Sequence, residues 1–277
     1  MSHYEAYDET SRHYDQTRIA VGAEIILDCL ARHGKPLEAL RVLDAGCGTG
    51  AYSQAIVGRV GRLEAMDMSR GMLDAARAKL ERPRRAGRIA FHQASITALP
   101  FEAASFDGIM INQVLHHLPD DGAPGYPLHR KVFAEFSRVL RPGGCLVINS
   151  CSRQQLDGAY WYYALAPRAK AAMIEGFVAL DVIEAILADV GFTVSGRFAP
   201  ADGLCQGVDY FDGRGPLDKH WRDGDSFWAL ADAEELEAAL ATVRDLDRDG
   251  ALDGYVAEHD ARRGEIGQIT FIHAKRL

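Results

Sequence analysis

Short apolar runs alternate along this chain with segments in which apolar residues recur at helical spacing. Runs such as RVLDAG (41–46) and FDGIMIN (106–112) end at polar or glycine positions, which is typical of strands buried on both faces. Apolar residues three or four positions apart, as in HRKVFAEFSRVL (129–140), indicate amphipathic helices. Strands are predicted at 41–46, 62–68, 88–94, 106–112, 145–150, 192–198 and 268–276, and helices at 19–33, 51–60, 71–80, 129–140, 181–190, 231–246 and 251–263. This alternation predicts an α/β fold, with a mainly parallel sheet and crossover helices on its faces.

The composition of the chain changes after residue 151. The stretch DGAYWYYAL (157–165) is rich in aromatic residues, and 201–231 is rich in glycine and aspartate without a regular pattern. A loop of this length is uncommon inside a compact domain and often forms a lid or a binding wall. We therefore divide the chain into four parts: an N-terminal helical lid (1–34), an α/β core (35–200), an insertion or cap (201–267) and a last core strand (268–277).

The overall composition is that of a soluble globular protein. The chain has 277 residues, 48% of them hydrophobic and 25% charged, which suffices for one large domain with a small cap. No apolar stretch approaches the roughly 18–20 residues needed to span a bilayer, and the polar start (1–18) resembles neither a signal peptide nor an anchor. Five scattered cysteines without a C-x-x-C pair favour a reducing compartment. We expect a cytoplasmic protein with no membrane partner.

The charge of the chain argues against a nucleic-acid partner. Proteins that bind nucleic acids need a basic face to displace counterions from phosphates, whereas this chain carries a net charge of −8. One basic cluster lies at 77–88 and includes Arg82, Arg84 and Arg85. A solvated helix end is the commoner explanation of such a cluster. We expect no nucleic acid among the partners.

A glycine-rich turn, VLDAGCGTG, follows the first predicted core strand. Its glycines let the backbone turn sharply and approach a ligand, and the next helix offers free N–H groups at its start. Asp67 ends the neighbouring predicted strand, so its carboxylate could accept hydrogen bonds from ribose hydroxyls at the same crevice. Because Gly46-x-Gly48-x-x-Ala51 also matches the dinucleotide fingerprint, these features fit NAD, S-adenosylmethionine or a purely structural turn.

Further motifs at domain-scale spacing distinguish between these ligands. HQASITALPF (92–101), SFDGIMINQVLHHL (105–118) and FAEFSRVLRPGGCLVI (133–148) follow LDAGCGTG and MDMSRGML in order. With these motifs, residues 38–150 resemble the class I S-adenosylmethionine-dependent methyltransferases, in the small-molecule branch that includes the ubiquinone and menaquinone enzymes. The resemblance implies a Rossmann-like, doubly wound sheet of seven mainly parallel strands with an antiparallel last strand. It also implies S-adenosylmethionine as cofactor and a small-molecule substrate.

The resemblance further implies which residues bind the cofactor. Asp67 would hold the ribose, Met68 would pack on the adenine, and Ser95 stands where family members usually carry an aspartate that accepts from the adenine amino group. A neutral hydroxyl accepts more weakly than a carboxylate. Tyr14 and Arg18 of the lid would reach the methionine carboxylate, unless this tyrosine-rich start is a surface helix. The expected cofactor-binding residues are Tyr14, Arg18, Asp44, Gly46, Cys47, Gly48, Gly50, Asp67, Met68, Ser95, Ile96, Asn112 and Gln113.

Two groups of residues are candidates for the substrate side. His116 and His117 follow the fourth predicted strand, where a histidine that titrates near neutral pH could remove a proton from the acceptor. His116 is preferred because it lies closer to the strand end, and helix capping or core packing is the alternative. Aromatic rings near the crevice could form a wall that stabilises a passing methyl cation, or could pack a cap. The expected substrate-binding aromatics are Tyr160, Trp161, Trp221 and Trp228.

The sequence thus predicts an enzyme that transfers a methyl group from S-adenosylmethionine to an O, N or C atom of a small-molecule metabolite. The alternatives are an RNA or protein methyltransferase, a nicotinamide-dependent oxidoreductase with the same turn, and a non-methylating protein on this scaffold. No metal site is expected, because the adjacent histidines point in different directions and the acidic residues of 202–225 lack calcium-loop spacing. The oligomeric state stays open, with a homodimer as one option.

Overall fold

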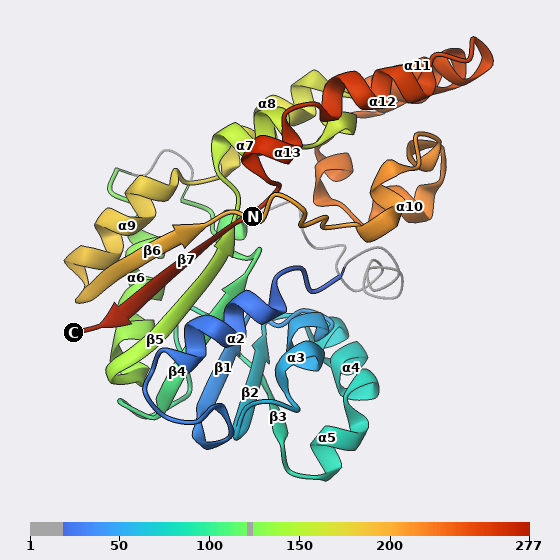
Figure 1. The fold of residues 1–277 in the computed structure, drawn as a ribbon. Helices are drawn as coiled ribbons and strands as arrows, with labels where there is room; N and C mark the ends of the chain where they lie inside the picture. The colour runs from blue at the N-terminus through green and yellow to red at the C-terminus, as the bar shows by residue number, and fades with distance from the viewer. Residues whose placement is uncertain (1–18, 121–123) are drawn as a thin grey trace.

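Seven strands form one central sheet in the computed structural model, which describes residues 19–120 and 124–277. The strands lie in the order β3-β2-β1-β4-β5-β7-β6 (Figure 1). Their bounds are β1 Arg41–Ala45, β2 Arg62–Asp67, β3 Ile89–Gln93, β4 Phe106–Asn112, β5 Leu140–Ser150, β6 Phe192–Phe198 and β7 Thr270–Arg276. Neighbours from β3 to β5 pair in parallel, whereas β7 is antiparallel to both β5 and β6. The predicted Rossmann-like sheet with an antiparallel last strand is confirmed.

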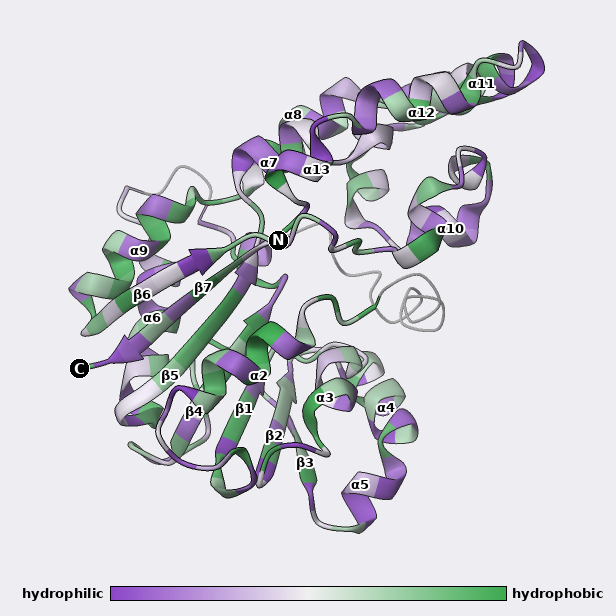
Figure 2. Cartoon of the chain, in the orientation of Figure 1, coloured by the Kyte–Doolittle hydropathy of each residue, from purple (hydrophilic) through white to green (hydrophobic). Residues whose placement is uncertain are grey.

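Helices cover both faces of the sheet because successive strand residues point to opposite sides. On β1, Val42 packs into the core on one face and Leu43 into the core on the other, and both are fully buried. The first core includes α2 (Ala23–Ala31), α3 (Ala51–Ile56) and α4 (Arg70–Lys79), and the second includes α6 (Pro127–Val139) and α9 (Leu180–Asp189). Figure 2 shows the hydrophobic colouring along the central strands between these helix layers.

A further layer of helices, the cap, stands at the carboxyl ends of the parallel strands (Figure 1). It is built from two segments, 153–176 before β6 and 207–266 after it, which pack against each other. The sequence-based division places 153–176 in the core and leaves 201–231 without regular structure, whereas the latter contains short helical turns. The cap helices are α7 (Arg153–Gly158), α8 (Pro167–Gly176), α10 (Lys219–Asp223), α11 (Ala233–Arg248), α12 (Leu252–Asp260) and α13 (Arg263–Ile266). Across the described chain, no helix is both long and apolar enough to cross a bilayer.

Packed aromatic rings give the cap a core of its own. Trp161 and Tyr162 are fully buried. The ring of Tyr162 stacks on Trp228 with centroids 5.9 Å apart and meets Trp221 edge-on at 5.0 Å. The indole N–H of Trp161 donates to the carbonyl oxygen of Tyr210 at 2.7 Å, so the polar atom of this buried ring is satisfied. Because aromatic rings bury large areas, this cluster holds short helices together that would be unstable alone.

The basic cluster forms the solvated end of helix α5 (Glu81–Arg85), one of the two explanations considered above. Arg84 and Arg85 lie 2.7 Å and 2.6 Å from carboxylate oxygens of Glu81. The three side chains are exposed, so these ion pairs contribute little to stability. Two of the arginine charges in the cluster are thereby partly neutralised by a neighbouring carboxylate.

Candidate active site

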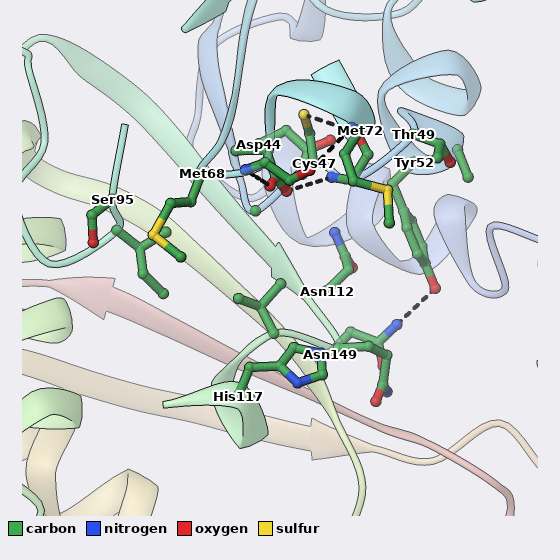
Figure 3. Close-up of a pocket in the computed structure, with 18 of the residues that line it drawn as sticks. Asp44, Cys47, Thr49, Tyr52, Met68, Met72, Ser95, Asn112, His117 and Asn149 are labelled. Carbon is green, nitrogen blue, oxygen red and sulfur yellow. Dashed lines mark hydrogen bonds between the residues drawn. The ribbon is translucent and has the colours of Figure 1, made fainter. Parts of the chain in front are cut away.

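A cavity of about 910 Å³ opens at the carboxyl ends of β1, β2 and β4 (Figure 3). Its volume lies within the roughly 300–1,000 Å³ typical of small-molecule sites. The position also fits, because open α/β sheets bind ligands where the strand order reverses, here between β1 and β4. Ten of the expected cofactor residues line this cavity, namely Asp44, Gly46, Cys47, Gly48, Asp67, Met68, Ser95, Ile96, Asn112 and Gln113.

The glycine turn forms one wall of the cavity. Gly46 has a φ of 79° and Gly48 a φ of 52°, conformations that favour glycine. The backbone N–H groups of Gly46 and Cys47 both donate to the carbonyl oxygen of Met66 at 2.8 Å, which ties the turn to the end of β2. A Cβ at Gly48 would meet no atom within 4 Å, so this backbone faces open space where a ligand can approach.

Gly50 has a different role from the one expected. It does not line the cavity, and it precedes helix α3 with a φ of 84°. A Cβ at this position would lie 3.0 Å from Leu80 and 3.2 Å from the side chain of Ala76. Gly50 therefore allows close packing of α3 against α4 rather than contact with a ligand in this cavity.

Substituting Gly46 by alanine should destabilise the protein by about 2 kcal/mol, the upper end of the cost of a left-handed backbone conformation for an L-residue. The new Cβ would also lie 2.6 Å from the Val114 side chain. Thermal unfolding followed by circular dichroism measures the effect. Gly58→Ala is the matched control, because a Cβ there meets nothing within 4 Å and the φ is not positive. Equal melting temperatures for the two variants would contradict this account of Gly46.

Asp67 connects the glycine turn to the start of helix α4. Its Oδ2 accepts a hydrogen bond from the Gly48 N–H at 2.9 Å, and its Oδ1 accepts one from the Ser69 N–H at 2.9 Å. Burial raises the pKa of the carboxyl group, while these backbone N–H groups oppose the shift. An ionised carboxylate has about four acceptor positions, so acceptor capacity remains for a ligand. Asp67 can thus hold two hydroxyl groups of a sugar.

Asp44 is a buried carboxyl group on the cavity wall. Its side chain accepts a hydrogen bond from the Ser53 hydroxyl at 2.7 Å, and only 1% of the residue is exposed. Burial raises the pKa of Asp44 to about 7, with a smaller contribution from the nearby charge of Asp67. The site is therefore suited to a cation, because a positive charge would stabilise the ionised form of this carboxyl group.

The raised pKa of Asp44 predicts a pH-dependent loss of stability. The folded protein binds this proton more tightly than the unfolded chain, so the contribution is full below the unfolded value of 3.8 and is lost as pH rises to about 7. Asp44→Asn, which retains an acceptor for Ser53, should melt several degrees higher than the wild type at pH 8 and near the wild-type temperature at pH 4. Melting curves across this range test the prediction. A difference that does not change with pH would contradict it.

Asn112 is the clearest sign that the cavity receives a polar ligand. The residue is 9% exposed and lines the cavity from the end of β4. Neither its amide nitrogen nor its amide oxygen has a hydrogen-bond partner in the part of the chain that the structure describes. Buried polar groups are nearly always hydrogen-bonded in native proteins, so an unsatisfied carboxamide facing a cavity points to a ligand.

An apolar slot lies at the other end of the cavity. Met68 is 73% exposed and lines it together with Ile96. The Ser95 hydroxyl accepts a hydrogen bond from the Thr97 N–H at 3.2 Å and lies 2.8 Å from the Thr97 hydroxyl. An exposed methionine beside an apolar wall suits a flat aromatic ring, which would cover both.

The two histidines differ in their surroundings. Both belong to the short 3₁₀ helix Leu115–His117, and their rings contact each other with centroids 3.9 Å apart. His117 lines the cavity, whereas His116 does not and instead stacks on Phe177 with ring centroids 4.3 Å apart. Of the two histidines, the structure therefore brings His117 and not the preferred His116 to the cavity.

The aromatic residues expected to bind substrate instead form the core of the cap. Tyr160, Trp161, Trp221 and Trp228 are at most 7% exposed, and none of them lines this cavity. Their rings pack against each other and against neighbouring rings because short helices need a large buried area to hold together. The sequence left two alternatives for these rings, a substrate-binding wall and packing of a cap, and their position fits packing of the cap.

Several cavity residues were not predicted, and two predicted ones cannot be placed. Tyr14 and Arg18 lie outside the described residues. Tyr52 and Asn149 carried a signal that was missed, since one follows the glycine turn and the other is the last residue but one of a predicted strand. Cys205 and Ile269 carried none, because they flank the cap segment 207–266 and lie far in sequence from the glycine turn.

A family model described as a methyltransferase domain matches residues 43–148. The matched segment runs from β1 to β5 and contains the glycine turn, Asp67 and Asn112. The chain carries a class I methyltransferase domain. The cavity described above is formed mainly by this methyltransferase domain.

Curated proteins and solved structures resemble the methyltransferase domain and its surroundings. Demethylmenaquinone methyltransferase of Clavibacter sepedonicus is 35% identical over 51% of this chain and 55% of that protein. Malonyl-[acyl-carrier protein] O-methyltransferase of Erwinia pyrifoliae is 31% identical over 69% of this chain and 66% of that protein. The chain thus spans about half to two thirds of these relatives. A crystal structure from Anabaena variabilis, described as a methyltransferase of an antibiotic biosynthesis pathway, has a TM-score of 0.74 at 21% identity, covering 95% of this chain and 100% of that one, which shows the fold.

S-adenosylmethionine is the cofactor of this class, and the methyltransferase domain has residues that fit each part of it. The remaining acceptor positions of Asp67 fit the ribose hydroxyls, and the slot at Met68 fits the adenine. The buried carboxyl of Asp44 suits a sulfonium cation, and the unsatisfied carboxamide of Asn112 suits the polar methionine tail. Within residues 19–120 and 124–277, no group of three or more His, Cys, Asp or Glu residues could hold a metal ion.

Proposed function

We propose that this protein transfers a methyl group from S-adenosylmethionine to an O, N or C atom of a small-molecule metabolite. The observation that carries the proposal is Asp67, which holds the glycine turn through Gly48 and keeps acceptor capacity directed at the same cavity in a methyltransferase domain. When bound, the cofactor supplies an electrophilic methyl group on a sulfonium cation.

The chain's own residues would position the reactants and accept a proton. Alignment of nucleophile and methyl group supplies much of the acceleration in such a displacement, so the fixed walls of the cavity matter most. His117 is the candidate base, because it lines the cavity and an imidazole can take a proton from an acceptor atom. Apolar residues such as Val114 and Ile269 would keep water from the reacting atoms.

A small acceptor is favoured over RNA or protein. The chain carries a net charge of −8, and the exposed arginines of α5 pair with Glu81. Two of the curated relatives are named as methyltransferases of demethylmenaquinone and of malonyl-[acyl-carrier protein], so both small and carrier-bound acceptors occur among similar proteins. We also propose a cytoplasmic location, in keeping with five buried cysteines that form no disulfide with one another. We propose, further, that the protein forms a homodimer.

Calorimetric titration with S-adenosylmethionine and with NADH tests the proposal. Binding of the first at micromolar concentration or tighter and no binding of the second are expected. NADH binding without S-adenosylmethionine binding would replace the proposal with a nicotinamide-dependent oxidoreductase. A screen of candidate metabolites with methyl-labelled cofactor, read as the mass gain of one methyl group, would then identify the acceptor.

A further inference from the structure

A chain of side-chain hydrogen bonds crosses the floor of the cavity. The Tyr52 hydroxyl, in α3, donates to the backbone carbonyl of Val21 at 3.0 Å. The amide nitrogen of Asn149, at the end of β5, donates to the Tyr52 oxygen at 2.8 Å (Figure 3). The amide nitrogen of Gln113, after β4, donates to the Asn149 amide oxygen at 2.9 Å. This series of hydrogen bonds therefore connects α3, the end of β5 and the residue after β4 to the backbone just before α2.

The chemistry of the groups fixes which of them donates and which accepts in each of these hydrogen bonds. A backbone carbonyl can only accept, so the single hydroxyl proton of Tyr52 must go to Val21. The Tyr52 oxygen then accepts, which requires Asn149 to turn its NH₂ group toward it and its oxygen toward Gln113. Gln113 is also held in the left-handed region, with a φ of 54°, by a hydrogen bond from its N–H to the Asn149 carbonyl at 2.9 Å. Such strained residues persist only where the surroundings hold them.

Residues 19–21 are also attached to the two connections that flank the cap segment 207–266. The Ile19 N–H donates to the carbonyl of Cys205 at 3.3 Å, and the Cys205 N–H donates to the side-chain oxygen of Gln268 at 2.8 Å. Ile19 and Cys205 both line the cavity. The segment 19–21 thus connects the core, through Tyr52, to the connection between β6 and the cap, through Cys205, and forms part of the cavity wall.

We propose that Tyr52 and Asn149 are positioning residues that hold segment 19–21, and with it the wall formed by Ile19 and Cys205, against the cavity. They act through the Val21 carbonyl, and the wall limits escape of the bound cofactor. This inference rests on the proposed function for its cofactor readout only, because attachment of the segment can be measured in the ligand-free protein.

Tyr52→Phe removes the hydroxyl and keeps the ring. It should therefore release the Val21 carbonyl without leaving a cavity where the ring packs. Trypsin cleaves after Arg18, and binding of the cleaved bond by the protease requires segment 19–21 on its C-terminal side to leave its partners, so the rate of this cut reports attachment of that segment. We expect the cut, identified by mass spectrometry as a new N-terminus at Ile19, to be about tenfold faster in Tyr52→Phe, in keeping with loss of the hydrogen bond to the Val21 carbonyl. S-adenosylhomocysteine, followed by stopped-flow fluorescence, should dissociate about fivefold faster.

Asn149→Asp provides a second, independent variant. Aspartate cannot donate to Tyr52, and as a charged acceptor it would draw the Tyr52 proton away from Val21. The tryptic cut should again be several-fold faster, while the ring of Tyr52 is intact. Because the added charge also faces the cavity, this variant is assessed by proteolysis of the ligand-free protein.

Tyr255→Phe is the matched control, since it removes a hydroxyl from a half-buried tyrosine that stacks on His259 in the cap. It should be cut at the wild-type rate. Wild-type rates for both Tyr52→Phe and Asn149→Asp, or an equal acceleration in Tyr255→Phe, would overturn the inference. Failure of the wild type to bind S-adenosylhomocysteine would count against the proposed function instead, and the proteolysis result would stand separately.

Discussion

Replacing His117 with alanine is expected to slow methyl transfer by about a hundredfold, a typical contribution of a positioned general base. His117 lines the cavity from the short helix Leu115–His117, directly after β4. The loss should appear in kcat, because it concerns a proton removed during the reaction. Affinity for S-adenosylhomocysteine should change little. Single-turnover rates with the acceptor found by the methyl-label screen, together with calorimetry, separate the two effects.

The neighbouring histidine provides the control for this prediction. His116→Ala removes an imidazole of the same type from the same short helix, and this ring contacts both Phe177 and His117 but does not line the cavity. Its single-turnover rate should stay near that of the wild type. A normal rate in His117→Ala would show that this histidine does not act as the base. A slow rate in His116→Ala alone would assign the role to His116.

Asp67→Ala is expected to weaken binding of S-adenosylhomocysteine by about 100-fold or more, because two hydrogen bonds to the ribose hydroxyls are lost. Hydrogen bonds to a charged acceptor contribute about 1.5–3 kcal/mol each, and each 1.4 kcal/mol corresponds to a factor of ten in affinity. The substitution also removes the acceptor for the N–H groups of Gly48 and Ser69, so the glycine turn loses its connection to α4. Calorimetric titration of the purified variant measures the loss directly.

Two further variants make the Asp67 result specific. Asp67→Asn keeps one acceptor oxygen and should lose less affinity than the alanine variant. Asp74→Ala removes an exposed carboxylate from the adjacent helix α4 and should bind as the wild type does. Circular dichroism checks that each variant is folded. Unchanged affinity in folded Asp67→Ala would remove this residue from the binding site.

The fold followed from the sequence because few topologies satisfy its pattern of strands and helices. Short apolar runs alternate with amphipathic segments, and right-handed crossovers then leave only a handful of arrangements of parallel strands. The main difference lies at β5, which begins at Leu140 although Pro142 and the following glycines predict a turn. The register between β4 and β5 shifts between Phe106 and Gly108, and this irregularity accommodates the extra residues.

The candidate site was predictable where its residues are close in sequence. The glycine turn and Asp67 form a local motif, and parallel strands bring their carboxyl ends to one edge. The parts that depend on the cap were not predictable. The run of aromatic residues at 160–163 is compatible both with rings that pack the core of the cap and with rings that line a ligand-binding cavity. Only the long-range packing of 153–176 against 207–266 distinguishes the two.

β7 joins the sheet last, although it lies inside it. It pairs with β5 on one side and with β6 on the other, with Thr270 opposite Ser150. While the chain is being synthesised, β5 therefore keeps an open edge until residues 270–276 leave the ribosome. The five strands from β3 to β5 can assemble before then, but exposed strand edges are sites of pairing between chains. Nascent or C-terminally shortened forms of this protein are consequently expected to aggregate through the edge of β5.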